Sequence, residues 1–299
     1  MATLRDIQRK IAAVKKTRQI TKAMNMVAAS KLRGAQQKME DFRPYALKFA
    51  EVIGNIAART EPTDNPLLRP RDAVKAVNLV LVTSDRGLCG GFNTNIIARA
   101  EELCTEKKSE NIEIVFTAVG RKGRDYARRY KYAIEDVRVG IAGGNFGFNA
   151  AVDIGRSLIN GYLRSVYDEV YIVYTQFVSM ARQVPIVRKL IPVSFSDMVS
   201  EHQGESVEKV PYLAEHICEP SAAALLEDLL PRYVYVQLYR ALLESTTSEH
   251  AARMMAMDNA TKNCNEMIDQ LTLLSNKARQ AAITKELMDI VGGAEALKG

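Results

Sequence analysis

The longest uninterrupted feature of the sequence is its C-terminal stretch from about Tyr233 to Val291, which contains neither proline nor glycine. Such a stretch predicts a single helix, which at ~1.5 Å per residue would be about 85 Å long. Helices of globular domains are several times shorter, so one compact domain cannot cover it. A second helix is therefore expected to pair with it along most of its length.

The N-terminal residues carry the pattern that such a partner helix needs. From Leu4 onward two rows of seam positions recur every seven residues through eight heptads. The first row is Leu4, Ile11, Arg18, Asn25, Leu32, Met39, Ala46 and Ile53, and the second is Ile7, Val14, Thr21, Ala28, Ala35, Phe42, Phe49 and Ile56. The C-terminal stretch has its own seam at Val236, Tyr239, Leu243, Met257, Ala260, Cys264, Met267, Leu271, Leu274, Ala278 and Ala281. This repeat predicts that the two chain ends form an antiparallel, left-handed coiled coil. The alternative is that two separate helices pack on unrelated domains.

The net charge of +6 is concentrated near the N-terminus. Residues 1–38 contain ten basic residues and one acidic residue, Asp6, which leaves the rest of the chain at about −3. The C-terminal helix, in contrast, mixes both signs along its length. A helix this basic predicts an acidic protein partner, a nucleic acid or an anionic membrane.

Part of the N-terminal seam is polar. Three successive seam positions from Arg18 to Asn25 carry polar side chains, which weaken pairing in a coiled coil. Ile20, Met24 and Val27 form an apolar row on a neighbouring face of the same helix. The helix is therefore expected to offer apolar surface here to something other than its paired helix.

Between the two long helices the pattern changes to strands that alternate with helices. Residues 77–83 are continuously apolar and β-branched, which predicts a strand buried on both faces. Further strands are expected at 112–119, 134–139, 170–177 and 184–193. Alternation of this kind predicts a mainly parallel sheet, and the last two strands, joined directly, predict an antiparallel hairpin on one edge.

The expected fold class combines α and α/β architecture: a long antiparallel two-helix coiled coil with an inserted, small Rossmann-like α/β domain. The predicted boundaries are 1–58 with 212–299 for the coiled-coil shaft, 74–195 for the α/β domain, and 59–73 and 196–211 for the linkers.

Two prolines bear on the limits of the long helices. Pro44 is expected to kink the N-terminal helix without ending it, because the seven-residue repeat continues beyond it. Ser221 is expected to cap a short helix that ends near Leu230, and Pro231 is expected to open the long C-terminal helix.

The glycine-rich turn from Ser84 to Asn93, after the first predicted strand, is the obvious candidate for a nucleotide-binding loop. It fits neither GxGxxG nor GxxxxGK[ST], and the glycine-rich segment 140–147 also fails both patterns. Asp85 and Arg86 are expected to form a salt-bridged turn pair. No second carboxylate, histidine or nucleophile lies at a spacing that suits acid–base catalysis.

The four cysteines and three histidines lie at spacings that match neither a zinc site nor a CxxC redox pair. No apolar run of about 18 residues predicts a transmembrane helix, and neither a secretory signal nor a presequence is expected. We therefore expect no catalytic residue, no cofactor and no metal, and buried cysteines in a reducing cytoplasm.

Three stretches together resemble one family closely. They are Ile20 to Leu32 in the first helix, Ser84 to Asn93 after the first strand, and Asn276 to Leu287 followed by Gly292 to Ala294. In this order they are similar to the gamma subunits of the F-type proton-translocating ATP synthase, and the resemblance covers essentially the whole chain. The cysteine pair that chloroplast members insert is absent between Val193 and Tyr212, so the resemblance is to the bacterial type.

The resemblance implies a rotor shaft that turns inside a hexamer of alpha and beta subunits. It implies that the α/β domain is a foot that contacts the epsilon subunit and the ring of c subunits, so that membrane association is peripheral and through the c ring. It further implies that the subunit binds no nucleotide and lies at the cytoplasmic face of the bacterial inner membrane.

The resemblance also implies contacts with the beta subunits for seven residues. They are Lys22, Met24 and Arg33 near the acidic lower tips of the beta subunits, Arg86 and Cys89 in a turn close to those tips, and Arg279 and Gln280 at a beta-subunit loop higher up the shaft. Residues beyond Ile283 are expected to reach an apolar collar at the top of the hexamer.

Two other functions compete with the rotor shaft. A nucleic-acid-binding scaffold would use the basic helix, but its basic residues recur beside the seam and form no groove studded with aromatic residues. A dinucleotide-dependent enzyme would need a phosphate-binding turn, which the sequence lacks. We therefore expect no nucleic-acid partner.

Overall fold

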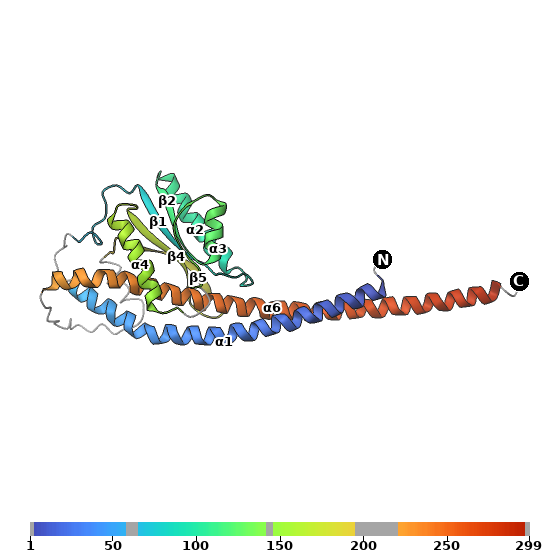
Figure 1. Cartoon of the computed structure of the whole chain (residues 1–299). Helices are drawn as coiled ribbons and strands as arrows, with labels where there is room; N and C mark the ends of the chain where they lie inside the picture. Colours follow the sequence, from blue (N-terminus) through green and yellow to red (C-terminus); the bar gives the residue numbers. More distant parts are fainter. Residues whose placement is uncertain (1–2, 58–64, 142–145, 195–220, 297–299) are drawn as a thin grey trace. The chain divides into compact units, whose positions relative to one another are not determined.

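The computed structural model describes residues 3–57, 65–141, 146–194 and 221–296 (Figure 1). The elements run in the order α1 (Leu4–Ala57), β1 (Ala76–Val82), α2 (Phe92–Ser109), β2 (Glu113–Val119), α3 (Arg121–Arg129), β3 (Ala133–Arg138), α4 (Phe148–Leu163), β4 (Glu169–Phe177), β5 (Gln183–Ile191) and α6 (Ala222–Ala296). The chain divides into two compact units: a smaller one of Met1–Ala29 with Arg253–Gly299, and a larger one of Ser30–Ala252. Both long helices contribute to both units.

Helix α1 begins with a reciprocal cap formed by two residues. The Asp6 amide donates to Thr3 Oγ1 (3.3 Å), while the amide and hydroxyl of Thr3 donate to Asp6 Oδ2 (3.1 and 2.6 Å). These hydrogen bonds stabilise the ionised carboxylate and lower the pKa of Asp6, most of all through the Thr3 hydroxyl. The cap satisfies amide donors that a helix start would otherwise leave unpaired.

In the smaller unit α1 and α6 pair in antiparallel orientation, as the heptad repeat predicts (Figure 1). Arg18 Nη1 donates to Asn265 Oδ1 at 3.1 Å, and the hydroxyls of Thr21 and Thr261 share a hydrogen bond of 2.8 Å. One turn further along α1, Asn25 Nδ2 donates to the Met254 carbonyl at 2.8 Å. Residue numbers therefore rise along α1 while those of their partners fall along α6.

The seam of α1 matches the prediction better than that of α6. Ile7 and Ala28 are buried as expected, and so is Met257 in α6. Ile268 is only 8 % exposed, whereas two predicted seam residues, Met267 and Leu274, are 50 % and 49 % exposed. The prediction of Met267 was therefore wrong by one residue, because a helix with 3.6 residues per turn can continue a seam after either three or four positions.

The hydrogen bond between Thr21 and Thr261 leads to a prediction about the seam. Replacing either residue alone with valine should weaken the pairing, because the remaining hydroxyl keeps only the carbonyl of its own helix and faces a methyl group across the seam. The double variant Thr21→Val/Thr261→Val should cost less than the sum of the single variants, by about 1 kcal/mol. Hydrogen exchange of the α1 amides in the smaller unit would measure this difference. Additive effects would contradict a direct interaction.

The larger unit contains a five-stranded sheet in the order β3-β2-β1-β4-β5. β1 lies parallel to both β2 and β4, β2 lies parallel to β3, and β5 joins β4 in antiparallel orientation. The mainly parallel sheet with an antiparallel hairpin on one edge is confirmed. Because the parallel strands all end at the same edge, the loops that follow β1, β2, β3 and β4 meet there.

The two faces of the sheet bury different sets of side chains. Alternate β1 residues point to opposite sides: Leu79 and Leu81 pack with α2 and α3, while Val80 and Val82 pack with α4 and the long helices. On the second side the Phe42 ring of α1 meets the Tyr239 ring of α6 edge-on, with 4.7 Å between the ring centroids. The parts of α1 and α6 in the larger unit thus form one layer of its core.

Neither proline ends a helix. α1 continues through Pro44 to Ala57, as predicted. The predicted separate helix before Pro231 was wrong, because α6 runs from Ala222 through Pro231 without interruption. Leu226 and Leu230 are fully buried in the same core as the residues after the proline, and this packing offsets the lost backbone hydrogen bond. Ser221 does cap the helix, accepting a hydrogen bond from the Ala224 amide (3.2 Å).

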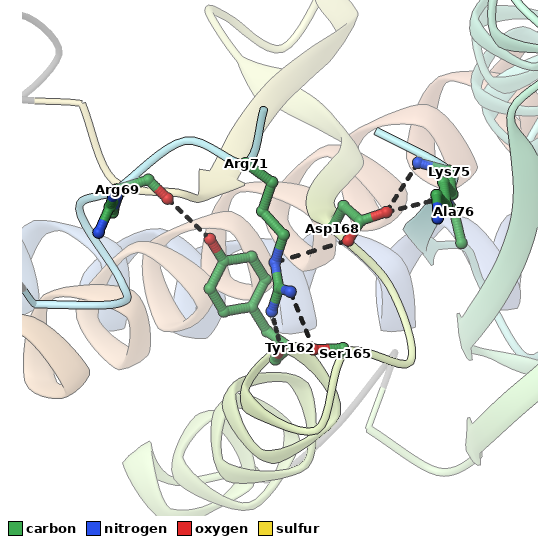
Figure 2. Close-up of polar contacts among 7 residues, drawn as sticks. All are labelled: Arg69, Arg71, Lys75, Ala76, Tyr162, Ser165 and Asp168. Carbon is green, nitrogen blue, oxygen red and sulfur yellow. Dashed lines mark hydrogen bonds and ion pairs between the residues drawn. The ribbon is translucent and has the colours of Figure 1, made fainter. Parts of the chain in front are cut away.

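A polar network fastens the amino ends of β1 and β4 (Figure 2). Asp168 Oδ2 accepts hydrogen bonds from the Lys75 and Ala76 amides (2.7 and 3.2 Å), and Oδ1 lies 3.5 Å from Arg71 Nε. Arg71 also donates to the Tyr162 carbonyl and to Ser165 Oγ, both at 2.8 Å. The network ties the segment before β1 to the connection between α4 and β4.

The predicted linker at 196–211 lies outside the described residues, and the one at 59–73 is described from Asn65 onward. In the parts of the chain that the structure describes, no helix combines the length and apolar character needed to cross a membrane.

Candidate functional site

The turn from Ser84 to Asn93 is closed by its own side chains. Asn93 Oδ1 accepts a hydrogen bond from the Ser84 amide (3.1 Å), and Asn93 Nδ2 donates to Cys89 Sγ (3.1 Å). The Ser84 hydroxyl donates to the Arg86 carbonyl at 2.6 Å. These bonds fix the two ends of the turn and its inner side, so that its apex has a defined shape.

The apex presents three exposed residues, Arg86, Gly87 and Leu88. Leu88 is 63 % exposed and has φ of +64°, a left-handed conformation that leucine rarely adopts. Cys89, in contrast, is only 2 % exposed and points into the turn. Of the two site residues predicted in this turn, Arg86 can therefore contact a partner directly, whereas Cys89 shapes the turn from inside.

Asp85 connects this turn to the loops that follow β2 and β3. Its Oδ1 accepts a hydrogen bond from the Arg121 amide and its Oδ2 from the Gly140 amide, both at 2.9 Å. Next to it the Lys122 amide donates to the Ser84 carbonyl (3.1 Å). Both carboxylate oxygens of Asp85 thus hold backbone groups, and the loops after three neighbouring strands form one connected edge.

The first backbone amides of α3 are already hydrogen-bonded within the chain. Helix N-termini bind phosphate in nucleotide-binding α/β proteins, because their first amide groups are unpaired. Here those amides donate to Asp85 Oδ1, to the Ser84 carbonyl and to Thr83 Oγ1 (2.7 Å from the Gly123 amide). A carboxylate of the chain itself therefore lies where a phosphate would bind.

The cysteines show no sign of a reactive site in the described ranges. Cys89 and Cys104 are buried free thiols, and Cys264 is half-buried. Burial raises the pKa of the Cys104 thiol to about 11, which keeps it protonated. Cys218 lies outside the described residues. Across residues 3–57, 65–141, 146–194 and 221–296, no three His, Cys, Asp or Glu side chains are grouped so as to hold a metal ion.

In the smaller unit α1 presents both apolar and basic side chains to its surroundings. Of the predicted row, Ile20 and Val27 are largely exposed and Met24 is half-buried. Lys22 and Met26 are exposed on another side of the helix, because they are not three, four or seven residues from Ile20. The predicted apolar row is thus exposed at Ile20 and Val27 but only partly at Met24. Its exposure indicates a surface that another chain covers.

Arg279 and Gln280 lie exposed on α6 at a different level of the same unit. Thr261, which faces Thr21, precedes Arg279 by 18 residues, or about 27 Å along the helix. The structure therefore separates this pair from Lys22 and Met24. Beyond them Ile283, Leu287 and Ile290 are exposed, so the apolar C-terminal end of α6 also lacks cover from the described residues.

Arg33 is exposed on α1 in the larger unit, the same unit that contains Arg86. The sequence identified the turn as important but missed the roles of Asp85 and Leu88. The bonds of Asp85 depend on residues 36 and 55 positions away, and the conformation of Leu88 has no signature in its residue type.

Comparison with known proteins places these features in one family. A family model described as ATP synthase matches residues 3–297. The ATP synthase gamma chain of Desulfosudis oleivorans is 56 % identical over 303 aligned residues, covering 100 % of both chains. That of Desulforapulum autotrophicum is 52 % identical over 298 residues, covering 99 % of this chain and 100 % of the relative.

Solved structures share the fold. A chain of the central stalk and c ring of the Tetrahymena thermophila mitochondrial ATP synthase is 27 % identical with a TM-score of 0.57, and the match covers 81 % of this chain and 99 % of that one. A chain from the OSCP/F1/c-ring part of the Euglena gracilis mitochondrial ATP synthase has a TM-score of 0.68 at 21 % identity, covering 98 % and 94 %.

Proposed function

This chain belongs to the ATP synthase gamma-chain family, and we infer that it is the central rotor shaft of an F-type ATP synthase. In this role it couples proton-driven rotation of the membrane c ring to conformational change in the catalytic alpha/beta hexamer, and so to ATP synthesis or hydrolysis. The observation that carries this inference is the 56 % identity to a gamma chain over the full length of both chains. The pairing of α1 with α6 suits the role of a shaft, because two interlocked helices resist twisting better than one.

We propose that different parts of the chain have different roles. Residues 1–58 and 212–299 act as the shaft, and residues 74–195 act as the foot. The partners are the alpha and beta subunits, the epsilon subunit and the c ring. The solved relatives come from assemblies that contain a central stalk, F1 and the c ring, which supports these partners.

The proposed beta-subunit contacts are Lys22, Met24, Arg33, Arg86, Cys89, Arg279 and Gln280. All except Met24 and Cys89 are exposed, and all the charged ones are basic, which suits acidic partner loops. The buried Cys89 would act indirectly, by holding the shape of the turn that presents Arg86.

We further propose that the chain itself does not hydrolyse nucleotide. The carboxylate of Asp85 at the start of α3 supports this proposal, because it would repel a phosphate there. We also propose peripheral attachment, through the c ring, at the cytoplasmic face of a bacterial inner membrane. The bacterial relatives support this location.

Reconstitution tests two of these proposals, the role as a shaft and the absence of nucleotide hydrolysis by the chain itself. The purified chain alone should show no ATP hydrolysis, and ATP should drive rotation of a bead attached to its α/β domain once alpha and beta subunits are added. Hydrolysis by the isolated chain would refute the non-catalytic proposal. Assembly without rotation would refute the shaft.

The proposed contact of Arg279 with a beta-subunit loop can be tested by charge reversal. Arg279→Glu should weaken assembly with alpha and beta subunits by about tenfold or more, because it replaces attraction to an acidic loop with repulsion. Arg129→Glu, at an exposed position of α3, is the matched control and should assemble normally. Co-purification at increasing salt measures the effect. Equal losses in both variants would remove the reason for singling out Arg279.

A further inference from the structure

The larger unit contains a cavity between α1, the end of β4 and α6. Its volume is about 190 Å³. An apolar cavity of about 150 Å³ is large enough to bind one benzene ring. The space therefore suits one six-membered ring with a small substituent. All the residues that line it belong to the larger unit, residues 30–252.

One small seam residue explains why there is space here. Ala46 lies in the heptad row between Met39 and Ile53, and its methyl group extends less far than the side chain of either neighbour. Phe42 and Leu243 line the remaining space with apolar surface. Protein interiors contain few voids larger than a water molecule, so a hollow of this size is a distinctive feature of the core.

The walls of the cavity are held in place by contacts between the three elements. The Phe42 ring of α1 meets the Tyr239 ring of α6 edge-on, with 4.7 Å between the ring centroids. The Ser248 hydroxyl of α6 donates to the Thr175 carbonyl of β4 at 3.2 Å. Because α6 is fastened to both α1 and β4, the cavity is preformed, and a ligand can bind with little rearrangement of the chain.

The polar groups of the lining are balanced in charge. They include Glu40 and Arg43 of α1 and Arg240 and Glu244 of α6, which together carry no net charge. Glu244 is only 6 % exposed, and its Oε1 accepts a hydrogen bond from Arg240 Nε at 2.9 Å. A charged ligand would bring an unbalanced charge into this partly enclosed space, which costs free energy. Gln176 of β4 adds an amide group, which both donates and accepts hydrogen bonds.

We propose that this cavity is a binding site for an uncharged small molecule with one aromatic ring and a polar end that both donates and accepts hydrogen bonds. The ring packs against Phe42, Ala46 and Leu243, and the polar end bonds to Gln176 and the charged side chains. Aromatic amides and phenols belong to this class. The proposal does not depend on the role as a shaft, because the site lies within the isolated chain.

Methyl NMR of the isolated full-length chain, with isotope-labelled methionine methyl groups, tests the site. Benzamide should shift the methyl resonance of Met39, which lines the cavity, with half-saturation at about one millimolar. A Met39→Leu variant assigns this resonance. Met257 in the smaller unit is the internal control, and its resonance should not move. A Met39 resonance unmoved at about ten millimolar benzamide would overturn the proposal.

Three further molecules test the ligand class, because they share the ring and differ at the polar end. Benzoate carries a negative charge, benzamidinium carries a positive charge, and toluene has no polar group. Each should need an at least several-fold higher concentration than benzamide to shift Met39. Equal binding of benzoate or benzamidinium would contradict the uncharged class. Equal binding of toluene would show that the polar groups contribute nothing, and the proposal would again be wrong.

Two substitutions that fill the cavity test where the ring binds. Ala46→Leu and Leu47→Phe each add side-chain atoms to the wall and should weaken benzamide binding by about tenfold or more. Ala98→Leu, at an exposed position of α2, is the matched control and should bind benzamide as wild type does. Urea midpoints followed by tyrosine fluorescence check that the variants are folded. If both cavity variants bound benzamide as tightly as wild type, the ring would lie elsewhere, and the proposed site would be refuted.

Discussion

Gly120→Ala is expected to lower the free energy of unfolding of the larger unit by about 4 kcal/mol. A Cβ at Gly120 would lie 2.1 Å from the Thr83 carbonyl oxygen and 2.7 Å from its carbonyl carbon. Thr83 cannot retreat easily, because it follows β1, which is paired with β2 on one side and β4 on the other. Gly120 also has φ of +97°, which strains any residue with a side chain.

Urea denaturation followed by tyrosine fluorescence measures this effect. All twelve tyrosines lie between residues 45 and 239, and the chain has no tryptophan, so the signal reports on the larger unit alone. Gly87→Ala, in the turn after β1, is the matched control. A Cβ there meets no atom within 4 Å, so the change should stay within about 0.5 kcal/mol. An unchanged urea midpoint for Gly120→Ala would show that the edge is less closely packed than the structure indicates.

The same substitution would also affect function. Gly120 precedes Arg121, whose amide bonds to Asp85, so a displaced backbone would release the turn that carries Arg86 and Leu88. A partly folded Gly120→Ala chain should therefore assemble less well than its residual stability alone would allow.

Much of the fold could be predicted, because a sequence pattern that extends over many residues still indicates the right element when a few of its positions do not fit. Eight heptads specify a paired helix even though Arg18, Thr21 and Asn25 are polar, and these three residues turn out to bond across the seam. The buried, β-branched run of β1 likewise predicted a central strand. The errors arose where one residue decides the outcome, as between Met267 and Ile268, whose hydrophobicity is similar.

The candidate site was harder to predict from the sequence than the fold was. The sequence singled out the turn, but the expected pairing of Asp85 with Arg86 considered only neighbours. In the folded chain Asp85 reaches amides 36 and 55 residues away. Those contacts depend on the strand order β3-β2-β1, which brings three loops to one edge. They are properties of the assembled sheet, which no local pattern encodes.

The competing functions can now be weighed on the structure. At the start of α3 the amides that could bind a phosphate bond instead to Asp85, Ser84 and Thr83, which disfavours a dinucleotide site there. Binding of a nucleic acid would not account for the exposed apolar side chains of Ile20 and Val27. Family membership and this mixed surface both favour a protein partner.

Asp168→Ala is the second substitution with a large expected effect, about 3 kcal/mol in the free energy of unfolding of the larger unit. Asp168 is 9 % exposed, and its removal leaves the Lys75 and Ala76 amides without their acceptor at the start of β1. Arg71 loses its carboxylate but keeps its bonds to the Tyr162 carbonyl and Ser165 Oγ, which limits the cost (Figure 2).

Two variants separate the parts of this effect in the same urea experiment. Asp168→Asn keeps an oxygen that can accept from both amides, but its NH2 group then faces the Arg71 guanidinium, a donor against a donor, in place of the ion pair. It should therefore cost more than half as much as Asp168→Ala but less than the whole. Asp125→Ala removes an exposed carboxylate paired with Arg124 at 2.7 Å and should cost less than about 1 kcal/mol. Because the backbone bonds, rather than the charge, hold the two strands together, Asp168→Asn must fall between the other two. If it were as damaging as Asp168→Ala, the contact with Arg71 would be the main support of this edge, and the role assigned to the amides would be wrong.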